Sequence, residues 1–239
     1  MYIWFLIITT MQPLLLLHGA LGSQAQFEAL KTKLSDRYQV YTLDFIGHGN
    51  SPMNDHEALS ISSFAQQVLA FLEEHKLSNV AIFGYSMGGY VALYLAKHYP
   101  DMVGKIFTLA TKFDWNPESS KKEAAMLDWE KMEQKVPKFI QHLQVIHQVD
   151  KAPKLVKETA EMMLAMGQQP PLTLAEVGSL EQPILFSVGD KDAMVSFDET
   201  LALYKSKTNN QLWVVPDTVH AFEKVNQDKL SREIEYFFN

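Results

Sequence analysis

The chain of 239 residues contains no cysteine, which excludes disulfides, thiolate catalysis and cysteine-ligated zinc or iron–sulfur sites together. Arginine is nearly absent too, because Arg37 and Arg232 are the only two, and the formal net charge at pH 7 is -7. With no basic stripe to bind a phosphate backbone, nucleic acid is not an expected partner. The eight histidines include no His-x-x-x-His pair on a predicted helix, so we expect no metal and no cofactor.

Long uninterrupted apolar runs are lacking as well. Residues 2–17 carry no charge, and a membrane anchor or a signal peptide is the alternative interpretation of this stretch. No basic residue precedes it, and threonine, glutamine and proline interrupt it before the roughly 20 apolar residues that a span needs. We therefore expect no membrane span and a cytoplasmic protein. Either Met1 or Met11 is the natural start.

What is present is a globular composition, with 47 % hydrophobic and 21 % charged residues. Short apolar runs alternate with amphipathic stretches, which is typical of an α/β fold whose mostly parallel sheet has helices on both faces. Residues 24–34, 61–75, 88–98 and 223–238 have helical spacing. The candidate strands are residues 14–17, 40–43, 80–83, 105–109, 184–188 and 212–215.

The segment of residues 112–177 interrupts this alternation. It is helical in pattern, rich in charge and proline, and has no strand candidate. We interpret it as a helical insertion late in the sheet, between two parts of one core formed by residues 1–111 and 178–239.

The segment GYSMG, residues 84–88, stands between a predicted strand and a predicted helix. Gly-x-Ser-x-Gly at such a junction is typical of a nucleophilic serine on a strained turn, where the glycines remove side chains that would collide with the strand and helix. A glycine-rich corner without a chemical role is the alternative for Ser86.

A serine nucleophile needs a base and a carboxylate that orients the base. Asp190 and Asp192 follow one predicted strand, and His220 follows the next. The resulting order Ser, Asp, His is the one that goes with this kind of elbow. The sequence therefore predicts Ser86, Asp192 and His220 as catalytic residues, with Asp190 as the alternative acid.

These motifs together resemble the α/β-hydrolase family in its small, lidded, cofactor-free form, and the resemblance covers nearly the whole chain. HGALG at residues 18–22 is similar to the family's oxyanion loop, DFIGHGNS at residues 44–51 to its Asp-x-x-Gly-x-Gly-x-Ser turn, and residues 112–177 to its cap. One departure is that only seventeen residues precede His18, where the family usually has two strands. Residues 2–9 have room for one strand at most.

The resemblance implies that the backbone N–H groups of Ala20 and Met87 form the oxyanion hole. It also implies Asp192, rather than Asp190, as the acid, because the family's carboxylate is usually the third residue after the glycine that ends the strand. His18 and His48 are then structural residues of the oxyanion loop and of the tight turn.

The insertion is rich in aromatic and methionine side chains, which suit an apolar substrate pocket. Candidate pocket residues are Trp115, Trp129, Met126 and Met163. The alternative is that these side chains only pack the insertion onto the core.

The predicted function is a serine hydrolase that cleaves a carboxylic ester or thioester of a small, largely apolar substrate through an acyl-enzyme. Two alternatives remain open: a carbon–carbon bond hydrolase or lyase with the same triad, and a ligand-sensing or signalling protein with little turnover. A serine nucleophile disfavours haloalkane dehalogenation and epoxide opening, since these need a carboxylate.

Overall fold

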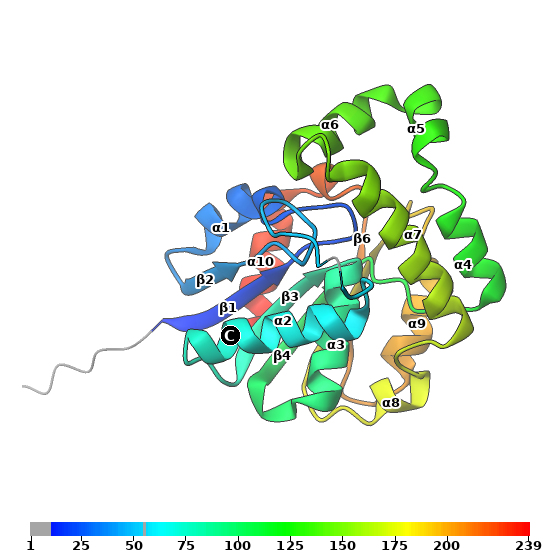
Figure 1. Ribbon diagram of the computed structural model, residues 1–239. Helices are drawn as coiled ribbons and strands as arrows, with labels where there is room; N and C mark the ends of the chain where they lie inside the picture. The colour runs from blue at the N-terminus through cyan, green and yellow to red at the C-terminus, as the bar shows by residue number, and fades with distance from the viewer. Residues whose placement is uncertain (1–10, 55) are drawn as a thin grey trace, which may run out of the picture.

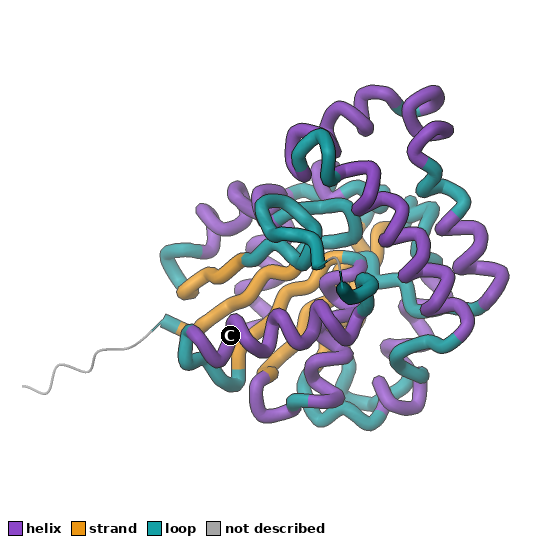
Figure 2. The backbone as a smooth tube through the Cα atoms, viewed as in Figure 1, coloured by secondary structure: helices purple, strands orange, loops and turns teal. Residues whose placement is uncertain are grey.

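The computed structural model describes residues 11–54 and 56–239. One parallel sheet has the strand order β2-β1-β3-β4-β5-β6 (Figure 2). The six predicted strands and the parallel sheet are confirmed, whereas the strand allowed for at residues 2–9 lies outside the described residues. The strands are β1 (Gln12–Leu17), β2 (Tyr38–Thr42), β3 (Val80–Tyr85), β4 (Val103–Leu109), β5 (Ile184–Gly189) and β6 (Gln211–Val215).

Helices connect the strands and cover both faces of the sheet. The predicted helix at 24–34 is split into a 3-10 turn and α1, the one at 223–238 is split in the same way, and α9 was missed by the sequence pattern. The helices are α1 (Glu28–Leu34), α2 (Ile61–Glu74), α3 (Met87–His98), α4 (Pro117–Ala124), α5 (Trp129–Lys135), α6 (Pro137–His147), α7 (Ala152–Gln168), α8 (Leu174–Gly178), α9 (Phe197–Lys205) and α10 (Gln227–Phe238), with 3-10 turns η1 (Gln24–Phe27), η2 (Pro100–Met102) and η3 (Phe222–Lys224).

Alternation along β1 shows why both faces are covered. Leu15 and Leu17 belong to the core under α2 and α3, and Leu14 and Leu16 belong to the core under α1 and α10. Successive side chains of a strand point to opposite faces, and all four leucines are fully buried. A strand buried on both sides reads as a continuous apolar run, which is the pattern of a parallel sheet.

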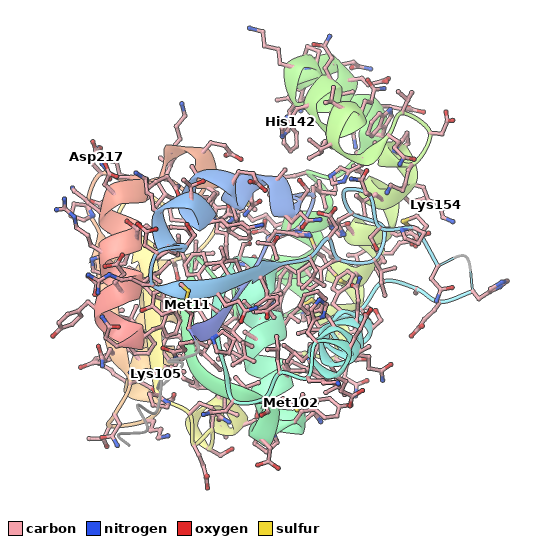
Figure 3. All side chains as sticks on the ribbon, turned by 90° about the vertical axis from the view of Figure 1, so that its left-hand side faces the viewer. Met11, Met102, Lys105, His142, Lys154 and Asp217 are labelled. Atoms are coloured by element: carbon pink, nitrogen blue, oxygen red, sulfur yellow. The ribbon has the colours of Figure 1, made fainter. Side chains whose placement is uncertain are left out.

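The chain between β4 and β5 contains the helices α4 to α8 and, in residues 110–183, no strand. Figure 1 shows α4 to α7 gathered on the upper right of the molecule. In Figure 3, His142 of α6 lies at the top with Asp217, which follows β6, while Met102, which directly precedes β4, and Lys105 of β4 lie lower down. This helical segment therefore lies toward the carboxyl ends of the strands, where parallel α/β sheets bind ligands.

Across residues 11–54 and 56–239, none of the helices combines the length and the apolar character that crossing a bilayer requires.

Candidate active site

Ser86 stands at the junction of β3 and α3 with φ 50° and ψ -117°. This is a strained conformation for a residue with a side chain, and it persists only where the surroundings fix it. Two hydrogen bonds do so here: the Ser86 N–H donates to the Leu109 carbonyl at 2.8 Å, and the Thr111 hydroxyl donates to the Ser86 carbonyl at 3.0 Å. The turn is thus held from β4 and from the residues just after it.

The glycines on either side of Ser86 are required by close backbone approach. A Cβ atom on Gly84 would lie 2.5 Å from the backbone of Gly89, and one on Gly88 would lie 2.2 Å from the Leu17 carbonyl oxygen. Backbone atoms at these distances leave no room for a methyl group, which is the reason inferred from the motif.

Asp192 and His220 come together from the loops that follow β5 and β6. The His220 Nδ1 lies 2.8 Å from the Asp192 Oδ2, and the Asp192 side chain is completely buried while 17 % of the His220 side chain is exposed. A carboxylate can only accept, so the proton is on Nδ1 and Nε2 is free to take a proton from a nucleophile. The second oxygen, Oδ1, accepts from the N–H groups of Met194 and Val195, both at 2.9 Å.

Tyr85 ties His220 to the serine turn. Its hydroxyl donates to the His220 carbonyl at 2.8 Å, and the two rings are 5.6 Å apart. Burial raises the pKa of Tyr85, so the hydroxyl remains a donor at neutral pH. The residue before Ser86 in the chain therefore holds the backbone of His220. Sequence reasoning missed this contact because the motif leaves the position of Tyr85 unspecified.

Asp190 has a different role. It is exposed, and its Oδ1 accepts from the Thr218 N–H at 3.1 Å, which joins the two loops after β5 and β6. Of the two candidate acids, the structure pairs Asp192 with the imidazole and uses Asp190 in a turn.

The segment of residues 18–22, here called the oxyanion loop after the motif that it resembles, is hydrogen-bonded to buried histidines. His18 accepts from the Phe45 N–H at 3.0 Å through Nε2, and its Nδ1 donates to the Gly19 carbonyl at 2.8 Å. Burial lowers the pKa of His18 to about 4, so the ring is neutral at pH 7. The ring is buried and hydrogen-bonded within the loop, which fits the structural role that the resemblance implies.

His48 supports the same loop from the turn after β2. Its Nδ1 donates to the Ile46 carbonyl at 3.0 Å, and its Nε2 accepts from the Leu21 N–H at 3.3 Å. Burial holds the pKa of His48 well below its usual value. Like His18, it is a neutral structural residue.

Asp44 fixes the start of that turn. One oxygen accepts from the Gln24 N–H at 2.7 Å, and the other accepts from the Gln24 side chain at 3.1 Å and the Asn50 N–H at 3.0 Å. Burial acts to raise the pKa of Asp44, but these hydrogen bonds outweigh it and lower the pKa overall. The carboxylate thus ties the turn to η1.

A cavity of about 40 Å³ opens beside Ser86 and brings five of the predicted site residues together, while a larger hollow of about 320 Å³ elsewhere contains none of them. The thioethers and rings around it make a largely apolar wall. The cavity is lined by Ala20, Ile61, Ser86, Met87, Tyr90, Lys112, Trp115, Met162, Met163 and Met166.

Two predicted pocket residues lie elsewhere. Met126, just after α4, is 49 % exposed, and Trp129, at the start of α5, donates from its ring to Glu133 at 3.0 Å on the same helix. Neither lines the cavity. Their apolar character predicted a pocket position, but in the structure Met126 is largely exposed and the Trp129 ring binds within its own helix.

Sequence reasoning missed a charged cluster at the cavity wall. The Lys112 Nζ lies 3.7 Å from the Glu123 Oε1 and 4.0 Å from the Glu199 Oε2. Glu123 is buried, and among the described residues its other oxygen has no hydrogen-bond partner. Burial raises the pKa of Glu199. No pattern in the sequence separates Lys112 from the other lysines, because its partners come from two distant helices.

Within the two described ranges, no three histidine, aspartate or glutamate side chains gather as ligands for a metal ion.

Comparison with known proteins places this geometry in a family. The sequence profile of the alpha/beta hydrolase fold matches residues 12–144. An abhydrolase domain-containing protein of Schizosaccharomyces pombe is 36% identical over 96 residues, covering 39% of this chain and 35% of that protein. The pimeloyl-[acyl-carrier protein] methyl ester esterase of Vibrio cholerae is 35% identical over 118 residues, covering 49% of this chain and 41% of the esterase. The matched region thus spans well under half the length of either relative.

Solved structures of other proteins superpose on almost the entire chain. A thermophilic esterase from Thermogutta terrifontis superposes with a TM-score of 0.78 at 22% identity, covering 96% of this chain and 90% of that one. The 2-hydroxy-6-oxo-6-phenylhexa-2,4-dienoate hydrolase of Rhodococcus gives a TM-score of 0.80 at 19% identity, covering 95% and 90%. At these identities the likeness shows the fold alone. With more than half of its length matched by the family profile, the chain belongs to the alpha/beta hydrolase fold family.

Proposed function

We propose that this protein is a serine hydrolase that cleaves a carboxylic ester or thioester of a small, largely apolar substrate through an acyl-enzyme. One observation carries the proposal. A serine on a strained turn is followed by a helix and preceded by Tyr85, whose hydroxyl donates to the backbone carbonyl of His220. The imidazole of His220 is itself paired with a buried carboxylate. This is the set of groups that nucleophilic acyl transfer needs.

The proposed reaction begins when the Ser86 Oγ attacks the substrate carbonyl carbon and its proton passes to the His220 Nε2. Asp192 keeps the imidazole in the right tautomer and stabilises the imidazolium that forms. The backbone N–H groups of Ala20 and Met87 stabilise the oxyanion, and one such donor is worth about 3 kcal/mol. His220 then protonates the leaving group, and water activated by the same base cleaves the acyl-enzyme.

The cavity supports an apolar acyl group, because Trp115, Met163 and other apolar side chains line it next to Ser86. The names of relatives point the same way, since they include a methyl ester esterase and a diacylglycerol lipase of Xenopus laevis. We assign residues 112–177 as a cap over a core of residues 1–111 and 178–239, with the cap supplying part of the acyl pocket.

The proposal is tested with p-nitrophenyl esters of increasing chain length and with a fluorophosphonate probe. The wild-type protein should turn over the esters and be labelled, and Ser86→Ala should lose both. The matched control is Ser35→Ala, which removes the hydroxyl of an exposed serine at the end of α1. This variant should behave as wild type.

Full turnover by Ser86→Ala would refute the assignment. Labelling of the wild-type protein without turnover of any ester would instead favour the ligand-sensing alternative. Replacing Asp192 by Asn should lower kcat by about 10⁴-fold, because the imidazole is then held in the wrong tautomer.

A further inference from the structure

Three histidines form a buried row that joins the oxyanion loop to α6. The ring centres of His18 and His48 are 5.0 Å apart, and those of His48 and His147 are 5.7 Å apart. All three side chains are fully buried. His147 is the last residue of α6 and comes from the segment assigned as the cap, so the row crosses from the core into that segment.

Each histidine fixes a different peptide group of the oxyanion loop. His18 donates to the Gly19 carbonyl, and because a peptide unit is planar, the direction of that carbonyl also sets the direction of the Ala20 N–H. His48 accepts from the Leu21 N–H. His147 binds the Leu21 carbonyl from the other side, with its Nε2 at 3.0 Å.

Leu21 needs this support. Its φ is 56°, in the left-handed region that costs free energy for a residue with a side chain and persists only when neighbours fix it. Two hydrogen bonds to rings, one at its N–H and one at its carbonyl, supply that restraint. The residue directly after Ala20 is therefore held in place from two separate segments.

The tautomer of His147 follows from its partners. Its Nδ1 lies 2.8 Å from the Gly49 N–H, which can only donate, so Nδ1 accepts. Its Nε2 lies 3.0 Å from the Leu21 carbonyl, which can only accept, so Nε2 carries the proton. A neutral ring satisfies both bonds and a charged ring breaks the one to Gly49.

We propose that His147 is a positioning residue for the oxyanion hole: from α6 it fixes the Leu21 carbonyl and thereby couples the seating of the cap to the orientation of the Ala20 N–H. This inference rests on the proposed function. It means that the hole is complete only while the end of α6 lies against the loop.

Lys151 provides the matched control. It binds the same turn from the same segment: its Nζ donates to the Gly49 carbonyl at 2.7 Å and to the Ser51 carbonyl at 2.8 Å. Among the described residues, Lys151 makes no hydrogen bond to Leu21. Lys151→Met should lower thermal stability and leave kcat unchanged.

Two variants at position 147 separate its two bonds. In His147→Gln the amide nitrogen reaches the place of Nε2 and keeps the bond to Leu21, whereas in His147→Asn the amide oxygen takes the place of Nδ1 and keeps only the bond to Gly49. We expect His147→Asn to lower kcat by about tenfold to a hundredfold with KM almost unchanged, because the oxyanion hole acts on the transition state. His147→Gln should keep kcat within about threefold of wild type.

The discriminating readout is the inhibition constant of a small trifluoromethyl ketone, which forms an oxyanion on the serine. Across these variants it should rise by the same factor by which kcat/KM falls. Equal losses in the Asn and Gln variants, or an unchanged inhibition constant, would overturn the inference and leave His147 with a merely structural role.

A measurement on the wild-type protein covers the case in which the Asn variant does not fold. With isotope-labelled histidine, the ring N–H signal of His147 should gain protection from solvent exchange when the ketone binds, and an unaltered signal would overturn the inference. Absence of both ester turnover and ketone binding in the wild-type protein would refute the proposed function itself, which distinguishes the two failures.

Discussion

Acidification from pH 7.5 to pH 5.5 should destabilise the fold through its buried histidines. In the folded protein burial lowers the pKa of His18 from the ordinary 6.5 to about 4, and burial also lowers the pKa values of His48 and His147. The unfolded chain therefore binds protons that the folded chain refuses. Their stabilising contribution is complete above pH 6.5 and is lost progressively as the pH falls from 6.5 toward the folded pKa values.

The magnitude for His18 follows from linkage. At pH 5.5 the loss is about 1.4 kcal/mol, and well below pH 4 it reaches about 3 kcal/mol, since each pKa unit corresponds to 1.36 kcal/mol. His48 and His147 add losses of the same sign. Asp44 does not contribute to the change in stability between pH 7.5 and pH 5.5, because its pKa is lowered and its carboxylate titrates at a more acidic pH.

The assay is urea unfolding at half-unit steps of pH, followed by circular dichroism, with the free energy of unfolding extrapolated to zero denaturant. The slope of that free energy against pH counts the protons taken up on unfolding. His147→Gln removes one titrating ring and should make the slope shallower by up to one proton. A free energy that is flat between pH 7 and pH 5.5 would show that these rings are not held neutral, and the tautomers assigned above would then be wrong.

Three further substitutions test the packing and charge of the site. Gly88→Ala forces a methyl group onto the carbonyl that ends β1 and should lower the unfolding free energy by about 1–3 kcal/mol with loss of activity; a variant as stable as wild type would contradict the close approach. Lys112→Met leaves the buried Glu123 and the partly buried Glu199 without their cation and should cost about 3 kcal/mol at neutral pH, a cost that shrinks on acidification because a carboxyl can then protonate. Asp44→Asn weakens charge-assisted bonds to two backbone N–H groups and should lower the urea midpoint, at about 1–3 kcal/mol, without changing KM.

The sheet was predictable because its central strands, such as β3 and β5, are buried on both faces and appear in the sequence as short apolar runs. The edge strands β2 and β6 are only partly buried and carry polar residues as well. The helix α9 was missed because it is short and only Thr200 and Leu203 are buried among its nine residues. Its position depends on packing against β5, which one segment's pattern does not reveal.

The candidate site, too, was predictable only in part. Ser86, Asp192 and His220 were proposed because turn chemistry and strand order mark the ends of strands, and these ends converge in any parallel sheet. Met126 and Trp129 were expected in the pocket only because the insertion is rich in apolar side chains. The amino-acid composition of an insertion does not determine how its helices are oriented.

Residues that act through contacts with distant parts of the chain could not be identified from the sequence. His147 contacts partners 98 and 126 residues away in the chain, and no local period relates it to them. Lys112 is similar, because its two carboxylate partners come from α4 and α9. Such contacts exist only once the tertiary structure has formed.

The strand order has a consequence for how this protein is made. The first described strand, β1, ends up between β2 and β3, so until the ribosome has released the residues up to Tyr85, one hydrogen-bonding edge of a very apolar strand is open. Unpaired edges of this kind invite pairing with other chains. Nascent or truncated chains that stop before β3 should therefore depend on chaperones, while chains that have passed it should not.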